Sequence, residues 1–157
     1  MKSWCPFIVS IFSVLVLGFP FVAFAQKADK DANLMLFDQD KTTHHFYLLK
    51  NGGAVELSAK DPADKSTIDA IQKHLASQAK SFEKGNFDMP AAEKGKVPDG
   101  VNTMKKLRKE ITFEVMQMDA GAALRMFSVN TQARQAIQDF LKFQIEEHHT
   151  GDPTEVQ

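Results

Sequence analysis

The sequence predicts an α+β fold in which two β-β-α repeats form a four-stranded antiparallel sheet with two helices on one face. Three observations predict it. A stretch from His44 to Phe82 has an echo from Ile111 to His149, each begins with apolar residues that alternate, and each ends with apolar residues at helical spacing. Neither repeat can bury its apolar face alone, so we expect one shared core and a single domain over residues 37–151.

The first repeat opens with a predicted β-hairpin. Two alternating runs, residues 43–49 and 54–60, flank an Asn51-Gly52 pair. Both central residues of a type I′ turn need a positive φ, so an Asn-Gly pair predicts that turn. The core face of the first strand then carries His44, Phe46 and Leu48.

A helix is predicted to follow this hairpin. Asp61 is the expected N-cap and Pro62 the first helical residue, because both types favour these positions. Apolar residues then recur at helical spacing, which predicts one stripe against the sheet. That stripe consists of Ile68, Ile71, Leu75, Ala79 and Phe82.

The second repeat has the same order. Ile111, Phe113 and Val115 alternate with polar residues, residues 119–121 predict a turn, and Asn130 predicts the N-cap of a second helix. The expected inner face of that helix consists of Ala133, Ile137, Phe140, Leu141 and Gln144, and His148 continues the line.

Residues 1–25 resemble a secretory signal. A positively charged start precedes an apolar run from Phe7 to Val22, and the Ala-Phe-Ala sequence ending at Ala25 is typical of a cleavage site. Cleavage after Ala25 predicts a periplasmic or secreted protein. The alternative is an uncleaved N-terminal membrane anchor, because the run approaches the roughly 20 residues that span a bilayer. Gly18 and Pro20 favour cleavage.

Removal of this segment changes the composition. Trp4 and Cys5 are the only residues of their types, so the mature chain has no disulfide. Loss of Lys2 leaves 18 of the 19 basic residues against 20 acidic ones. No concentrated basic face is predicted, which argues against nucleic acid or a membrane surface as partners.

The remaining segments are predicted to be less regular. Residues 26–36 read as a flexible leader, and residues 83–110 as a linker interrupted by glycine and proline, with a short helix around Val101 to Leu107. The tail, residues 152–157, lacks apolar anchors and is predicted to be frayed.

Histidines are the main candidates for chemistry. The mature chain has no cysteine, no Gly-x-Ser-x-Gly motif and no phosphate-binding glycine-rich loop, so we predict no catalytic residue and no enzymatic activity. Neutral imidazole binds transition metals, and copper and zinc are the candidate ions. The candidate ligands are His44, His148, His45 and His149.

Convergence of these histidines depends on strand order. If the first strands of the two repeats are adjacent, the order is 2-1-3-4, and His44 and His148 meet at one end of the core, whereas His74 does not join them easily. The alternative is that His44 and His148 are half-buried and hydrogen-bonded, while His45 and His149 face water. We favour the second interpretation, because adjacent His pairs lack the fixed spacing of a zinc site.

The outer face of the predicted sheet carries a second candidate site. A soft-metal or hydrophobic-ligand surface is one use of these side chains. A dimer or partner interface is the favoured one, because an exposed apolar sheet face generally requires a cover. The residues are Tyr47, Leu49, Met116, Met118 and Phe127.

Several short motifs occur along the domain. They are Thr42-Thr-His44, Phe46, Gly52-Gly53, Lys60-Asp-Pro-x-Asp64, His74-Leu75, Phe82, Gly85-x-Phe87, Pro90-Ala91, Gln144 and His148. Together they resemble a family of small uncharacterised bacterial proteins, over residues 37–152. The chain departs from that pattern at Gln138, where relatives often carry His, and at Glu147, where they carry Asp.

Some members of that family are labelled aspartate carbamoyltransferase. This chain is far shorter than such a catalytic subunit and lacks its Ser-Thr-Arg-Thr loop, so the label does not carry over. The resemblance implies the fold unit and no established activity. The leading prediction is therefore a non-enzymatic exported protein that binds a metal ion or small ligand through histidines. The alternative is an accessory module that dimerises or docks through the outer sheet face. A hydrolase or transferase is the third alternative.

Overall fold

A computed structural model describes residues 37–87 and 97–157. The predicted signal peptide, the rival membrane anchor and the leader lie outside these residues, as does part of the predicted linker. Within the described ranges, no helix combines the length and the hydropathy that a membrane span requires.

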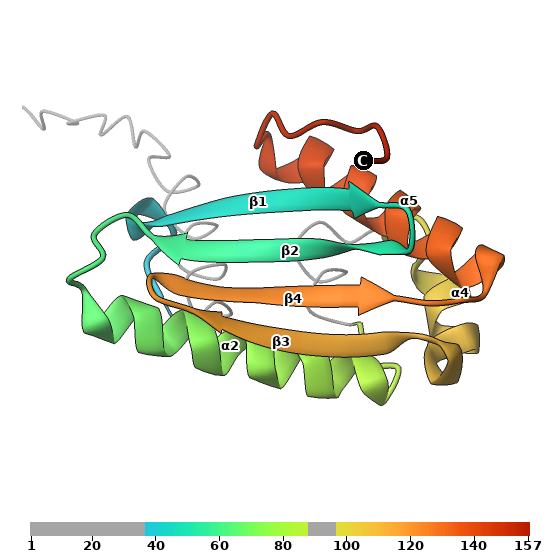
Figure 1. Cartoon of the computed structure of the whole chain (residues 1–157), viewed down its shortest axis with the longest axis horizontal. Coiled ribbons are helices and arrows are strands. Elements are labelled where there is room, and N and C mark those ends of the chain that lie inside the picture. The colour runs from blue at the N-terminus through green and yellow to red at the C-terminus, as the bar shows by residue number, and fades with distance from the viewer. Residues whose placement is uncertain (1–36, 88–96) are drawn as a thin grey trace, which may run out of the picture.

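The sheet has four antiparallel strands: β1 (Thr42–Leu49), β2 (Gly52–Ala59), β3 (Thr112–Met118) and β4 (Gly121–Phe127). Two long helices, α2 (Lys65–Glu83) and α5 (Thr131–His148), lie on one of its faces (Figure 1). The α+β fold with two ββα units is therefore confirmed. Shorter elements complete the described part: η1 (Gln39–Lys41), α4 (Val101–Leu107) and η2 (Arg108–Glu110).

The strand order β1-β2-β4-β3 differs from the predicted 2-1-3-4. The second strands of the two hairpins pair at the centre, with Val55 opposite Leu124. Glycine begins both central strands, and a Cβ at Gly52 or Gly121 would run into the backbone of the opposite strand, at Met126 O or Leu57 O respectively. These glycines permit the close approach of β2 and β4. The alternation of apolar and polar residues, from which the strands were predicted, carries no information about which strands are neighbours.

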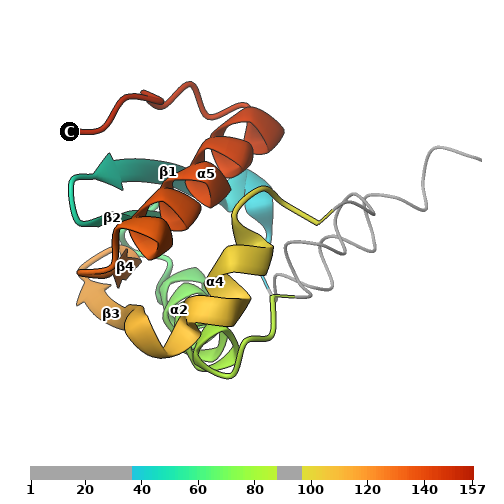
Figure 2. The ribbon, with the colours of Figure 1, turned by 90° about the vertical axis from the view of Figure 1, so that its right-hand side faces the viewer.

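Each helix covers the hairpin of the other unit. Helix α5 follows β4 but packs against β1 and β2, whereas α2 follows β2 but packs mainly against β4 and β3. Figure 2 shows the two helices and α4 together on the same side of the sheet. The two units are thereby interlocked around one core, and neither has a hydrophobic core of its own.

The prediction of a type I′ turn at Asn51-Gly52 is wrong. Strand β1 ends at Leu49 and β2 begins at Gly52, so the loop residues are Lys50 and Asn51. Gly52 has a φ of 149°, and among the described residues His149 is the only non-glycine with a positive φ. Asn51 therefore lacks the positive φ that a type I′ turn demands.

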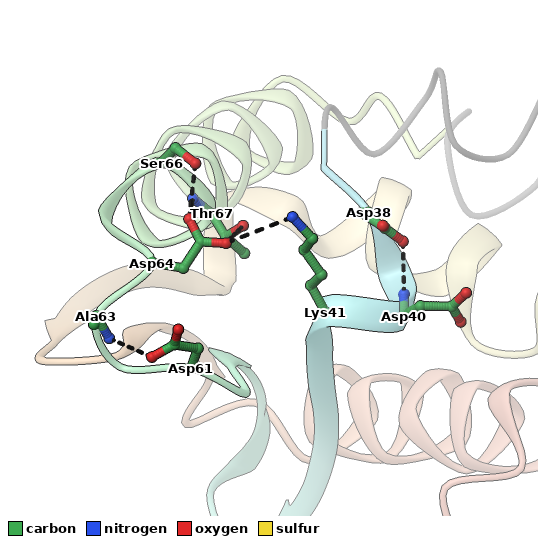
Figure 3. Close-up of polar contacts among 8 residues, drawn as sticks. All are labelled: Asp38, Asp40, Lys41, Asp61, Ala63, Asp64, Ser66 and Thr67. Atoms are coloured by element: carbon green, nitrogen blue, oxygen red, sulfur yellow. Dashed lines mark hydrogen bonds and ion pairs between the residues drawn. The ribbon is translucent and has the colours of Figure 1, made fainter.

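Helix α2 begins later than predicted. Its N-cap is Asp64, and its first residue is Lys65. Asp61 instead closes a turn ahead of the helix, where its carboxylate accepts the Ala63 N–H at 2.8 Å. Figure 3 shows the two carboxylates in these successive positions.

Hydroxyl groups decide which aspartate caps α2. The Asp64 carboxylate accepts the Thr67 N–H at 3.1 Å, the Thr67 hydroxyl at 2.8 Å and the Ser66 hydroxyl at 2.7 Å. These bonds, led by the one from Ser66, lower the pKa of Asp64 to about 2, and Lys41 lies 3.9 Å away (Figure 3). The cap therefore stays charged at neutral pH. Asn130 caps α5 as predicted, accepting two backbone N–H groups.

Both predicted helical stripes are buried. Phe82 is at the centre of an aromatic cluster, with its ring centroid 4.4 Å from Phe87, 5.9 Å from Phe113 and 6.1 Å from Phe140. The short linker helix α4 was also predicted, and it packs against α5. The core thus joins the two units and the linker.

The tail differs from the frayed segment that we predicted. It runs beside β1 in Figure 1, and the Gln157 N–H donates to the Leu48 carbonyl at 2.9 Å. The Asp152 carboxylate accepts the Phe46 N–H at 2.9 Å. Edge strands present unpaired backbone groups, so a polar tail can bind one without apolar contacts.

Candidate functional site

His44 and His148 meet at one end of the core, a convergence that the sequence predicted only for the strand order 2-1-3-4. Their rings are parallel to within 4°, with centroids 5.8 Å apart. The route differs from the predicted one. Strands β1 and β4 both pair antiparallel with β2, so they run the same way, and α5 returns across β1. The end of α5 therefore lies over the start of β1.

His148 is held by two neighbours besides His44. Its Nε2–H donates to the Gln144 side-chain oxygen at 3.2 Å, one helical turn earlier. Its ring also stacks near Phe46, with centroids 5.7 Å apart and planes inclined by 27°. Gln144 is buried, so this amide fixes the orientation of the imidazole.

His44 has an unusual environment. Its Nε2 is buried and has no hydrogen-bond partner among the described residues. Burial lowers the pKa of His44 to about 4, with smaller contributions from the charges of His148, His74 and His45. The imidazole is therefore neutral at pH 7, which is the form that accepts a hydrogen bond or binds a metal ion.

His74 is buried, although the sequence placed it on the flank of the apolar stripe. It is buried in α2, and its ring meets Phe37 edge to face with centroids 5.4 Å apart. Its charge is one of those that lower the pKa of His44, and burial lowers its own pKa. Sequence spacing placed it on the flank of the stripe, but contact with Phe37 buries that flank.

The other two candidate ligands are separated from the pair. His45 lies on the outer sheet face, where its Nδ1 is 2.9 Å from the Asp152 carboxylate. His149 follows the end of α5, is exposed and has a φ of 51°. Within residues 37–87 and 97–157, no group of three or more His, Cys, Asp or Glu side chains is arranged to hold a metal ion.

None of the helices within residues 37–87 and 97–157 lies on the outer face of the sheet. In Figure 1 the sheet lies in front and both long helices lie behind it. The strand register places every predicted interface residue on this uncovered face. They are Tyr47, Leu49, Met116, Met118 and Phe127. Met116 is 46% exposed, which is high for a large apolar side chain.

Charged residues that the site prediction missed share this face. The Arg125 guanidinium lies over the Phe127 ring at 5.9 Å and makes no ion pair within the described residues. Glu114 is opposite Arg125 in the β3–β4 register. Glu56 is near Tyr47, whose pKa is raised by burial and by the charge of Glu56. The sequence contained a signal for them, because Glu114 and Arg125 occupy the same alternate positions of their strands as Met116 and Phe127.

A separate open hollow of about 380 Å³ lies between α4 and α5. Its lining residues are Asp99, Gly100, Asp139, Lys142, Phe143 and Glu146. Small-molecule pockets are mainly lined by apolar side chains, and Phe143 is the single aromatic residue here. This hollow does not include any of the histidines.

Comparisons of the chain with family models, with curated proteins and with solved structures found no match. The family resemblance therefore stays a prediction. The two candidate sites of this protein are the inner histidine pair and the outer sheet face.

Proposed function

We propose that this protein is an exported docking module that associates with a second copy of itself through the outer face of its sheet. One observation carries the proposal: both helices leave this face uncovered, although three of its strands present aromatic, leucine or methionine side chains. An exposed sheet face that carries several large apolar side chains among charged ones is typical of an interaction site.

The charges on the face favour a second copy over an unrelated partner. Arg125 lies on β4 and Glu56 on β2, and the register places them on neighbouring rungs, with Ala54 opposite Arg125 and Ala123 opposite Glu56. A two-fold axis between β2 and β4 lays β4 of one copy over β2 of the other. Arg125 then comes within reach of Glu56 of the second copy, and the same contact is repeated.

The area of the outer sheet face limits the expected strength of the association between two copies. Four strands about 4.8 Å apart and about 24 Å long offer about 450 Å² on each partner. Stable complexes bury about 800 Å² per partner. We therefore expect a reversible dimer with a dissociation constant of about 1 μM or weaker.

Sedimentation of matched variants tests this proposal. Met116→Asp introduces a charge on the outer face and should leave the protein monomeric, because an unpaired carboxylate would be buried in the interface. Val129→Asp is the control, since Val129 is 95% exposed and lies outside the four strands, in the loop before α5. A Met116→Asp variant that dimerises like the parent would contradict the proposal.

Export is the second part of the proposal, and residues 1–25 support it. Expression of the full-length sequence in a bacterial host, followed by N-terminal sequencing of the product, tests it. We expect the chain to begin at Gln26. A product that retains Met1 and stays with the membrane would favour the anchor.

A metal or small-ligand site at His44 and His148 is the second candidate function. The buried Nε2 of His44, which has no hydrogen-bond partner among the described residues, favours it. Such an unsatisfied buried polar atom costs about 1–3 kcal/mol. A copper or zinc ion, or a donor group of a ligand, would offset this cost. His148 could supply a second imidazole ligand if its Nε2 were released from the hydrogen bond to Gln144.

Thermal unfolding of the untagged protein with each ion tests this second function. A ligand at 100 times its dissociation constant stabilises a fold by about 2.7 kcal/mol. The shift should vanish in the His44→Ala/His148→Ala variant and persist in His149→Ala, which removes an exposed histidine. A shift of equal size in both variants would assign the ion to another place.

A further inference from the structure

We propose that the outer edge of β1 is a binding site for a peptide segment that carries a carboxylate side chain, and that residues 152–157 occupy this site within the chain. The proposed site lies at the edge of the sheet, although one of its groups, His45, projects on the outer face. The Met116→Asp variant separates this site from the proposed association through the sheet face.

Strand β1 is at the edge of the described four-stranded sheet, where it pairs with β2. On its open side, the Phe46 N–H donates to one oxygen of Asp152 at 2.9 Å, and the other oxygen lies 2.9 Å from Nδ1 of His45. The Asp152 side chain is only 11% exposed. One carboxylate is thus bound by a backbone donor and an imidazole from adjacent residues.

The rest of the tail follows β1 loosely. The next contact is the Gln157 N–H, which donates to the Leu48 carbonyl at 2.9 Å. Five residues of tail therefore span two residues of strand, and Pro153 has no N–H to contribute. Residues 153–157 are all exposed. The tail is a strap fixed near its two ends, whereas a true strand would bond regularly along the edge.

The chemistry at Asp152 indicates an acidic ligand. Burial alone would raise the pKa of Asp152, but hydrogen bonds from His45, Thr150 and Phe46 outweigh it, and the pKa is lowered. The bound carboxyl group is therefore ionised. A charge-assisted hydrogen bond is about twice as strong as a neutral one, so an amide should be a poor substitute.

Attachment to the same chain makes the strap a strong competitor. A tethered segment acts at an effective concentration of about 1 mM or more when its linker is short. A free peptide must displace it, so binding in trans should be weak while Asp152 is in place. Loosening the strap should expose the edge and raise the apparent affinity.

The test uses the full-length sequence, purified in the form that accumulates, with Asp152→Asn and the control Glu155→Gln. Glu155 is an exposed acid in the same strap. We expect the Phe46 amide to exchange with solvent at least tenfold faster in Asp152→Asn and at the parent rate in Glu155→Gln. Unchanged exchange in Asp152→Asn would overturn the proposal.

Peptide binding supplies the second measurement. A labelled peptide, Gly-Asp-Pro-Thr-Glu-Val-Gln, copies residues 151–157. It should bind the Asp152→Asn variant at least tenfold more tightly than the parent, and a peptide with Asn in place of its Asp should bind at least tenfold more weakly. Equal binding of the two peptides would overturn the proposal. Met116→Asp should leave this binding unchanged, which separates it from the sheet-face interface.

Discussion

His44 and His45 are adjacent in β1, but they lie in opposite environments. His44 points into the core, parallel to His148, and burial keeps it neutral. His45 points to the outer face and contacts Asp152 of the tail. Successive residues of a strand face opposite sides, so a shift of one position exchanges burial for a surface contact. The contrast teaches that one strand contributes to two separate sites.

The same contrast divides the whole sheet. The inner face is covered by α2 and α5, whereas no helix of the described part of the chain covers the outer face. Substitutions on the inner face should therefore reduce the free energy of unfolding, and those on the outer face should reduce association. Substitutions whose expected effects on stability differ can test this division.

The largest effect is expected at Phe82. Phe82→Ala should lower the free energy of unfolding by about 3–5 kcal/mol, because it leaves a cavity among three other aromatic rings. Phe127→Ala on the outer face is the matched control and should cost much less, since its ring is only partly buried. Urea denaturation measures both. Equal losses would contradict the division into two faces.

A fall in pH should have the second-largest effect on stability, through His44 on the inner face. The folded pKa of His44, about 4, is below the unfolded value of 6.5, so unfolded chains bind more protons as the pH falls. Stability is fully present above pH 6.5 and should decrease by up to about 3 kcal/mol as the pH falls through about 4. His74 shifts in the same direction.

Unfolding measured at several pH values checks this expectation. His44→Phe should flatten the slope between pH 6.5 and 4, because it removes the titrating group, and His149→Phe should not. Carboxylates contribute to the lower end of this window, so the difference between the variants is the useful quantity. An unchanged slope in His44→Phe would contradict the buried neutral state.

The cap of α5 should have a smaller effect. Asn130 accepts N–H groups of Gln132 and Ala133, at 2.8 and 3.2 Å. Asn130→Ala should cost about 1 kcal/mol, the usual value for a lost N-cap. Gln132→Ala, at the exposed second position, is the control. Thermal unfolding measures the loss of stability in both variants. If Asn130→Ala lost no more stability than Gln132→Ala, the cap would not be formed in solution.

The smallest effect on stability is expected on the outer face. Met116→Asp should change the free energy of unfolding of the monomer by no more than about 0.5 kcal/mol, because exposed positions tolerate substitution. The same change should abolish the dimer. Denaturation at a concentration well below the dissociation constant measures the first quantity. A large loss there would place Met116 in the core.

Much of this architecture was predictable from periodicity. The helical stripes and the strand alternation report burial directly, so the two faces of the sheet were predicted. Strand order could not be predicted, because both orders leave every residue on the same face. The convergence of His44 and His148 was predicted only for an order that the structure does not have. Gly52 and Gly121 held the information, but only the opposing backbone reveals why a side chain is excluded there.

The misses at the candidate sites have physical causes of the same kind. Asp61 and Asp64 both suit an N-cap, and the hydroxyl groups after Asp64 decided between them. The strap over β1 uses backbone groups, which composition does not report. Burial of His74 depends on Phe37, a residue far from it in the chain. Contacts between distant segments were the missing information in each case.

The most direct test of the outer-face interface is a charge exchange measured by sedimentation equilibrium. Arg125→Glu and Glu56→Arg should each leave the protein monomeric, and a double variant carrying both should dimerise again, because the repeated contact is restored with its signs reversed. A wild-type chain that stays monomeric at about 1 mM would contradict the account, since even a weak specific interface forms at that concentration.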